Sequence, residues 1–298
     1  MVRPSLTPAH AALALLIMAI WGTNFVVIKL ALAHLPPLTF AALRFTLAAL
    51  PAVFFFKRPA VPWRSLAAYG ILIGVGQFGL LYIAMRGSIS PGLASLVVQT
   101  QAFFTIGLAM VFTGERLRGF QVVALLLATA GIGWLMVHAG AEATPLGVGL
   151  VLTTAMSWAL GNTVQRQANP PNMLAFVIWS SLFAIPPLFA LSLALEGPTA
   201  VLRGLTTSTP GTWAAVLWQS VGNTLFGYAV WGWLLARYPA ATISPLSLLV
   251  PVFGMVASAM LLGESLAVWK VTAAGLVLSG LALNTLWPMI RRMRTQAV

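Results

Sequence analysis

The sequence predicts an all-α membrane protein in which ten transmembrane helices form two inverted five-helix repeats. Three observations support this fold class: an apolar composition, a short phrase that occurs twice, and the placement of the basic residues. The chain has 298 residues, of which 60% are hydrophobic and 7% charged, and its mean hydropathy is +0.95. A soluble domain of this size cannot bury so much apolar surface, so lipid must solvate much of the chain.

The repeated phrase indicates a duplication. Gly114–Leu117 reads Gly-Glu-Arg-Leu and Gly263–Leu266 reads Gly-Glu-Ser-Leu, so Glu264 follows Glu115 by 149 residues, half the chain length of 298. Each copy follows one long apolar stretch and precedes another. Ser95 and Ser244 stand at the same offset. Such internal repeats are typical of membrane bundles built from two related halves.

Ten stretches are long enough to cross a bilayer, which takes about 20 apolar residues. Turn-forming Pro and Gly residues separate them, because both interrupt helices. In chain order the predicted spans are 9–32, 37–56, 65–85, 90–113, 119–138, 146–167, 172–195, 210–235, 240–262 and 267–290.

The basic residues test this count. With ten spans, four basic residues fall on the side away from the N-terminus, Arg44 lies within the second span, and eleven fall on the N-terminal side. Those eleven are Arg3, Lys57, Arg58, Arg64, Arg116, Arg118, Arg166, Arg237, Arg291, Arg292 and Arg294. Cytoplasmic loops carry the excess of Lys and Arg, so both termini are expected in the cytoplasm.

Five helices per half is an odd number, so the second half is expected to run upside down relative to the first. The two predicted repeats are residues 1–142 and 143–298. Trp21 precedes Lys29 by eight residues and Trp158 precedes Arg166 by eight, so the first and sixth spans correspond.

The N-terminus also formally resembles a cleavable signal peptide. Arg3 precedes the apolar run 11–20, and small residues follow at 31–33. The apolar segment is nevertheless too long, because it continues to Leu32, and this favours a retained first transmembrane helix.

Composition argues against several other classes of protein. Cysteine is absent, which excludes disulfides and thiolate metal sites, and His10, His34 and His138 are scattered near helix ends, so we expect no metal and no cofactor. The basic residues stand singly between apolar segments, so we expect no nucleic-acid partner. No nucleophile–base constellation indicates an enzyme. The glycines of 74–79 spell a dinucleotide fingerprint, but no strand precedes them.

These residues carry a resemblance to a known family. Gly-Glu before the fifth and tenth spans, Trp21 followed by Lys29, and Arg44-Phe45 in the second span resemble the EamA-type exporters of the drug/metabolite transporter superfamily. Within it the chain is most similar to the YddG-type aromatic amino-acid exporters. The resemblance implies a cavity lined by helices 1, 3, 4, 6, 8 and 9, peripheral helices 5 and 10, and alternating access.

Polar residues inside spans are the candidate substrate-binding residues, because such groups are costly in lipid. The predicted cavity residues are Trp21, Asn24, Gln77, Tyr82, Gln99, Trp158, Asn162 and Asn223. The sixth span gives the best stripe, since helical spacing places one set of its residues on one face: Thr154, Trp158, Gly161, Asn162 and Gln165. The alternative is that these groups bond neighbouring helices.

Charged and proline residues have mainly structural interpretations. Glu115 and Glu264 each begin a helix, where a negative charge is favourable, and Arg116 or Lys270 can pair with them. Arg44 can snorkel or bond backbone carbonyls; the alternative is that it attracts a carboxylate. Pro245 and Pro251 are candidates for a hinge in the ninth span.

The expected function is export of neutral, aromatic amino acids by alternating access across the bacterial inner membrane, by a monomer. The four acidic residues, Glu115, Glu142, Glu196 and Glu264, all lie at or near predicted loops. An exporter of cationic drugs coupled to protons usually needs a buried carboxylate. The alternative is export of another metabolite or drug-like solute, with or without proton coupling.

Overall fold

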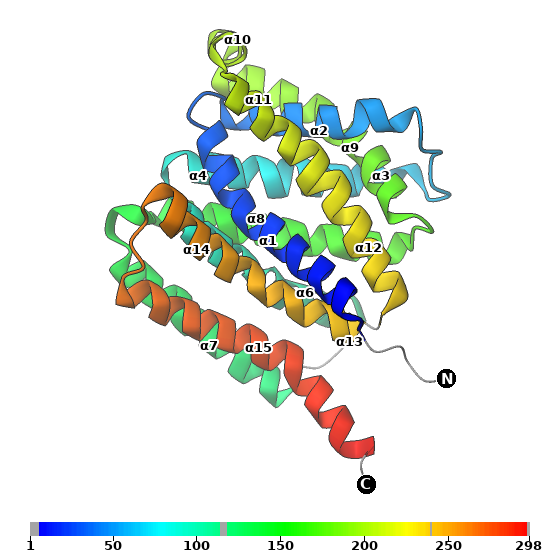
Figure 1. Cartoon of the computed structure of the whole chain (residues 1–298), viewed down its shortest axis with the longest axis vertical. Coiled ribbons are helices and arrows are strands. Elements are labelled where there is room, and N and C mark those ends of the chain that lie inside the picture. The colour runs from blue at the N-terminus through cyan, green and yellow to red at the C-terminus, as the bar shows by residue number, and fades with distance from the viewer. Residues whose placement is uncertain (1–5, 114–117, 239, 297–298) are drawn as a thin grey trace.

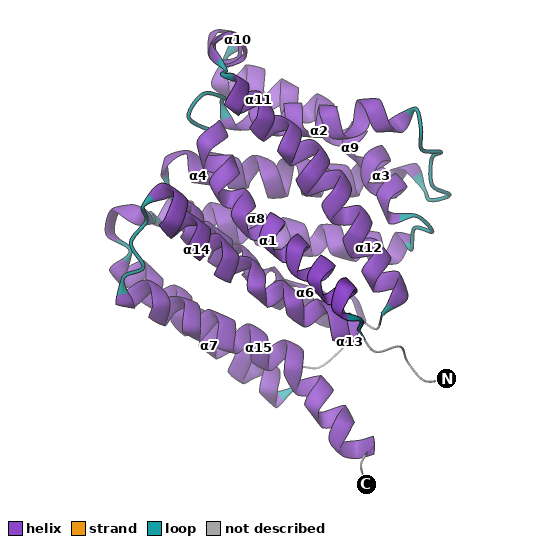
Figure 2. Cartoon of the chain, in the orientation of Figure 1, coloured by secondary structure: helices purple, strands orange, loops and turns teal. Residues whose placement is uncertain are grey.

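The computed structural model describes residues 6–113, 118–238 and 240–296. Figure 2 shows that the elements of this part of the chain are helices. The first half contains α1 (Pro8–Ala31), α2 (Pro37–Val53), α3 (Trp63–Ile71), α4 (Leu80–Gly87), α5 (Pro91–Val97), α6 (Gln101–Thr113) and α7 (Gly119–His138). The second half contains α8 (Pro145–Ala168), α9 (Met173–Leu191), α10 (Pro198–Thr207), α11 (Pro210–Leu217), α12 (Gly227–Arg237), α13 (Ala240–Ile243), α14 (Leu249–Leu262) and α15 (Val268–Gln296).

Several of these helices are continuous rods that change their winding part-way. A π-helical segment, Leu72–Gly79, joins α3 to α4, and a second, Trp218–Phe226, joins α11 to α12. Short 3₁₀ segments, Val98–Thr100 and Ser244–Leu248, join α5 to α6 and α13 to α14. A further π segment, Ser192–Glu196, ends α9, and a 3₁₀ turn, Gly140–Glu142, follows α7. The sequence does not predict the irregular winding at three of the four internal positions, and at the fourth, Ser244–Leu248, it predicts only a candidate hinge at Pro245.

Prolines start six of the described helices, and Gly263 stops one. Proline occupies the first position of α1, α2, α5, α8, α10 and α11, where its missing N–H costs nothing. The side chains of Thr7, Thr144, Asn172 and Thr209 cap four helices by accepting a backbone N–H. Gly263 ends α14 with φ of +71°, which favours glycine.

Seven helices of the described chain are long and apolar enough to cross a membrane. They are Pro8–Ala31, Trp63–Gly87, Pro91–Leu108, Gly119–His138, Met173–Glu196, Pro245–Leu262 and Val268–Pro288. The three other predicted spans fall short for two reasons: α2 has only 17 residues, and α8 and the α11–α12 rod carry many polar side chains. The count of ten spans therefore stays a prediction.

The rods pack side by side (Figure 1). α7 lies along α15, α2 along α9, and α1 along α14, while α8 packs on α6 and on the segment Leu72–Gly79. We call the end of the bundle at the start of α1 the proximal end and the end at Ala31 the distal end. The last residues of α15 point to the same lower-right part of Figure 1 as the start of α1.

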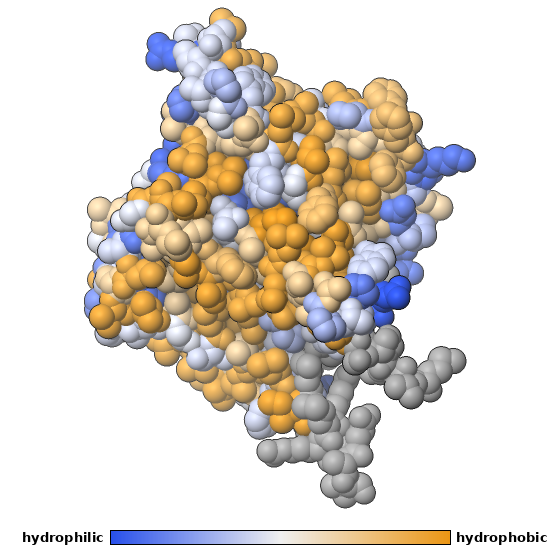
Figure 3. Space-filling view, viewed as in Figure 1, coloured by the Kyte–Doolittle hydropathy of each residue, from blue (hydrophilic) through white to orange (hydrophobic). Residues whose placement is uncertain are grey.

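Apolar side chains cover the middle of the face seen in Figure 3, and hydrophilic residues gather towards its edges. Exposed apolar side chains are frequent on α7 and α15, for example Leu126 at 64% and Val271 at 55% exposure. An apolar belt of this kind suits a lipid environment.

The short helix α10 is not among the predicted elements. Residues 196–209 lie between the predicted spans 172–195 and 210–235, but Pro198 starts a ten-residue helix there. Its Gly204 lies against Pro36 and His34, so α10 covers the distal turn between α1 and α2.

Candidate functional site

The interior of the bundle is organised around one buried cation, Arg44 of α2. Arg44 has no exposed surface. Its Nε donates to the Thr224 hydroxyl at 3.1 Å, and its two terminal nitrogens donate to the Tyr82 hydroxyl at 2.9 Å and to Asn223 Oδ1 at 3.3 Å. The guanidinium carbon also lies 3.6 Å from the centroid of the Phe78 ring, a cation–π contact. Arg44 thus links α2 to α4 and to the π segment Trp218–Phe226.

Amide and indole groups extend this network towards α1. Gln219 Nε2 donates to Asn24 Oδ1 at 2.6 Å, and both side chains are buried. Trp21 Nε1 donates to the backbone carbonyl of Asn223 at 3.4 Å. These bonds join α1 to the π segment Trp218–Phe226, whose widened turn also receives a hydrogen bond within the segment, from Thr224 Oγ1 to the Gln219 carbonyl. Such π turns are frequent at functional sites.

An aromatic group lies next to this polar network. The Trp21 ring centroid is 5.8 Å from that of Tyr228 and 5.5 Å from that of Trp231, both on α12. A Cβ at Gly227 would meet the Trp21 indole at 2.6 Å, so glycine lets the ring approach α12 closely. The three aromatic side chains are only partly buried.

A cavity of about 10 Å³, the size of one water molecule, adjoins Arg44. Its lining comes from α2, α3, α9, α12 and both long π segments. The polar side chains that line it are Arg44, Tyr69, Ser180, Ser181, Thr224 and Tyr228. Drug-sized ligands fill pockets of roughly 300–1,000 Å³, so this space holds no amino acid in the present arrangement.

The polar stripe of α8 divides into two parts. Thr154 is fully buried and its hydroxyl donates to the Gln77 carbonyl at 3.2 Å, while Gly161 packs against Ile73. These two residues hold α8 against the segment Leu72–Gly79. Trp158 and Asn162 are partly exposed and make no polar contact that joins them to the Arg44 network in the described chain.

The structure therefore brings four of the eight predicted cavity residues together. Trp21, Asn24, Tyr82 and Asn223 join one network through Arg44 and Gln219. Gln77, Gln99, Trp158 and Asn162 lie outside it. Gln77 is buried with Oε1 unpartnered among the described residues, and Gln99 is buried in a 3₁₀ segment.

Four residues of this interior are not among the predicted cavity residues: Arg44, Thr224, Tyr228 and Ser180. A signal for Arg44 was present, because it is a charge in the middle of an apolar span. Thr224, Tyr228 and Ser180 carry no such signal, because uncharged hydroxyl residues are common in membrane helices.

The described carboxylates all lie at the distal end. Glu196 caps α2: its oxygens accept from the backbone N–H groups of Leu38 at 2.6 Å and Thr39 at 3.1 Å. Glu142 and Glu264 flank Lys270 of α15, and the Lys270–Glu264 nitrogen–oxygen distance is 3.9 Å. Glu264 also accepts from the Ser90 hydroxyl at 3.0 Å.

Lys270 has the expected partner Glu264. It also pairs with Glu142, which lies closer, and it is only 1% exposed. The Glu115 side chain, its proposed pairing with Arg116 and the charge of Arg3 lie outside the described residues.

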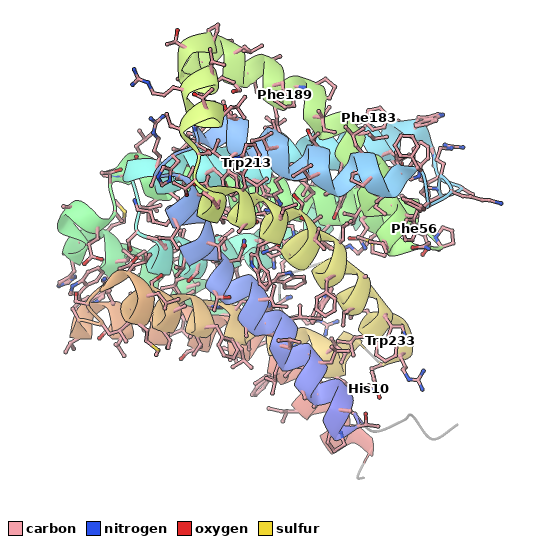
Figure 4. All side chains as sticks on the ribbon, turned by 45° about the horizontal axis from the view of Figure 1, so that its top comes forward. His10, Phe56, Phe183, Phe189, Trp213 and Trp233 are labelled. Atoms are coloured by element: carbon pink, nitrogen blue, oxygen red, sulfur yellow. The ribbon has the colours of Figure 1, made fainter. Side chains whose placement is uncertain are left out.

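At the proximal end, side chains from α1 and α12 meet (Figure 4). His10 Nδ1 lies 2.5 Å from the Tyr238 hydroxyl, and the His10 ring packs edge-on against Trp233 at 4.9 Å between centroids. Within the described residues, no group of three or more His, Cys, Asp or Glu side chains is placed to hold a metal ion.

Known proteins resemble this chain along nearly its whole length. The EamA-like transporter family matches it twice, over residues 9–137 and 145–286. A Salmonella typhimurium protein named "Probable amino-acid metabolite efflux pump" is 42% identical over 286 residues, covering 94% of this chain and 96% of that protein. An Escherichia coli protein of the same name is 42% identical over 278 residues, covering 91% and 93% of the two chains.

A solved crystal structure shares the fold, with a TM-score of 0.64 over 96% of this chain and 99% of the other, at 19% identity. The two family matches and the two close relatives have a direct consequence. This chain belongs to the EamA-like transporter family, and it is therefore a membrane transporter and not an enzyme.

Proposed function

We propose that this transporter exports neutral, aromatic amino acids from the cytoplasm by alternating access. One observation carries the proposal: the interior is lined by amides and aromatic rings, with Trp21, Tyr228 and Trp231 beside Asn24 and Gln219. Amides can satisfy the charged ends of a zwitterion, and aromatic rings suit an apolar side chain. The names of the two close relatives, amino-acid metabolite efflux pumps, support the same substrate class.

We place ten helices across the membrane as two inverted repeats, 1–142 and 143–298. The positions of the irregular segments support this division. In each half the third membrane span carries a long π segment: it is α3–α4 in the first half and α11–α12 in the second. The fourth span of each half, α5–α6 or α13–α14, carries a 3₁₀ segment. The packing pairs support it too, since α1 packs on α14 and α8 on α6, and a two-fold axis in the membrane plane would exchange these two pairs.

The two halves would rock about the interior network, with the distal end facing outward. At that end the turn before α5 bonds the turn before α8, through Ser90 N–H to the Glu142 carbonyl and Thr144 N–H to the Ser88 carbonyl. Release of an amino acid to the outside requires these contacts to part. The 3₁₀ segment at Pro245, between α13 and α14, is our candidate for the hinge in the ninth predicted span.

Proton-coupled export of cationic drugs fits the interior less well. The three described glutamates are held at the distal end by Lys270 or by the start of α2, away from Arg44. A buried cation would also repel a cationic solute. We place the protein in the bacterial inner membrane, as a monomer with both termini cytoplasmic.

The test is a transport assay with purified protein in liposomes. Vesicles loaded with labelled phenylalanine, or with a cationic dye, are diluted into solute-free buffer with and without a pH gradient. The proposal predicts that phenylalanine leaves protein-containing vesicles faster than protein-free ones, and that the dye does not. Dye efflux that needs the gradient, with no movement of phenylalanine, would establish the alternative solute class.

A further inference from the structure

Arg44 is a buried charge without a counter-charge in the described chain. It is the eighth of the 17 residues of α2, so it lies at mid-depth of its helix, and it has no exposed surface. The described carboxylates are engaged elsewhere: Glu196 with the start of α2, and Glu142 and Glu264 with Lys270. Burying an ion without a partner of opposite charge is strongly unfavourable, and such residues in membranes are usually functional.

We propose that Arg44 binds the carboxylate of the transported solute, an inference that rests on the proposed function. The partners of Arg44 are neutral oxygens of Tyr82, Asn223 and Thr224. They orient the guanidinium without neutralising it. A guanidinium has five N–H donors, and the nitrogen that donates to Tyr82 carries a second hydrogen for another acceptor.

The cavity beside Arg44 has the polarity of an anion site. Its polar lining consists of the guanidinium and of hydroxyl groups, and it includes no carboxylate. The hydroxyls of Ser181 and Thr224 already donate to the backbone carbonyls of Val177 and Gln219, which leaves the guanidinium and the remaining hydroxyls as donors. The hydroxyl of Ser180 is the clearest sign. Ser180 is 1% exposed and its Oγ has no partner among the described residues. A buried hydroxyl left unpaired is costly, and a bound carboxylate oxygen would accept its proton.

The neighbouring groups fit an amino acid better than a small inorganic anion. The remaining N–H of Arg44 can donate a charge-assisted hydrogen bond to a carboxylate oxygen, since the other four bond Tyr82, Asn223 and Thr224. Asn223 joins the cation to the rest of the interior: its side chain accepts from Arg44, and its backbone carbonyl accepts from Trp21. A solute held by its carboxylate at Arg44 would therefore place its apolar part towards the rings of Trp21 and Tyr228. Because the cavity is only about 10 Å³, the helices around it must part before the solute enters.

Binding to the purified full-length protein tests this inference separately from transport. The probes are L-phenylalanine, 3-phenylpropionate, which lacks the amine, and phenethylamine, which lacks the carboxylate. Binding is followed by tryptophan fluorescence, at fixed sodium chloride and again with chloride replaced by gluconate. We expect the two carboxylates to bind the wild-type protein in both salts and phenethylamine to bind at least ten-fold more weakly.

Substitutions identify the group responsible. Arg44→Gln is expected to weaken both carboxylates at least ten-fold, the scale of a charged hydrogen bond, and to leave phenethylamine unchanged. Arg44→Lys should retain part of the binding, because it keeps the charge. Ser180→Ala removes the unpaired hydroxyl and should weaken both carboxylates several-fold. Ser258→Ala is its matched control, because Ser258 Oγ is also buried and unpaired but lies on α14, outside the cavity lining.

The outcomes separate the two proposals. If Arg44→Gln weakens the binding of all three probes equally, Arg44 does not recognise the carboxylate and the inference is wrong. The inference is also wrong if the fluorescence change depends on whether chloride is present and not on the probe. If Arg44→Gln does not fold, the comparison of Ser180→Ala with Ser258→Ala decides, and equal binding by the two variants overturns the inference. If the wild-type protein binds carboxylates through Arg44 but moves no amino acid in vesicles, the inference stands and the proposed function fails.

Discussion

Gly70 offers a quantitative test of how closely α3 and α9 pack. A Cβ built on Gly70 would lie 2.1 Å from the backbone carbonyl oxygen of Ser180, whereas real Cβ atoms essentially never approach closer than 3.0 Å. Gly70→Ala must therefore push two backbones apart by about 1 Å. Overpacking of a core costs about 1–3 kcal/mol, and a contact with backbone belongs in the upper half of that range.

The higher helix propensity of Ala relative to Gly offsets about 1 kcal/mol of this loss in stability. The net loss expected for Gly70→Ala is thus about 1–2 kcal/mol, a fall of roughly 2–8 °C in melting temperature. Gly133→Ala on α7 is the matched control, since a Cβ there would meet nothing within 4 Å. It should raise the melting temperature by roughly 2–4 °C.

The assay is thermal unfolding of both purified variants in one detergent, followed by intrinsic fluorescence. A Gly70→Ala protein that melts at or above the wild-type temperature would refute the close approach of α3 and α9. Equal shifts in the two variants would mean that helix propensity alone sets their stability.

Three further substitutions test other parts of the structure. Lys270→Met leaves its two glutamates unpaired and should cost about 3 kcal/mol, measured by thermal unfolding, whereas exposed Arg203→Met should change little. Glu196→Gln removes the charge that caps α2 and should cost about 1–2 kcal/mol; an unchanged melting temperature would show that the cap is unimportant. Trp158→Ala should slow phenylalanine efflux far more than Trp269→Ala at equal expression, and equal rates would exclude the α8 stripe from the solute path.

Much of the fold follows from the sequence because lipid imposes simple rules. Long apolar stretches and their proline or glycine breaks locate the helices, and Pro8, Pro37, Pro91 and Pro145 each begin a helix near a predicted boundary. The winding of the rods could not be predicted in this way. A π segment such as Leu72–Gly79 has the same apolar character as an α-helix, and it differs in its backbone hydrogen bonds, which the residue pattern does not reveal.

The candidate site was harder to predict because helical periodicity gives a face but not its neighbour. Trp158 and Thr154 lie on one predicted stripe, yet Thr154 bonds the backbone of another helix and Trp158 does not join the network. Arg44 shows the opposite case. Its charge was visible, but its partners come from residues about 40 and 180 positions away, which no local pattern reveals.

The two long π segments give the interior a way to move without moving the ends of its helices. A π turn holds about one residue more than an α turn, so the widened turn is local slack in the rod. If that turn migrates by one position, the residues it passes rotate by roughly 100° while the flanking helix stays in place. Gln77 and Asn223 both lie within such segments. Their amides would then rotate about the helix axis, towards a solute or away from it. Spin-label distances between helix ends would stay constant during this rotation.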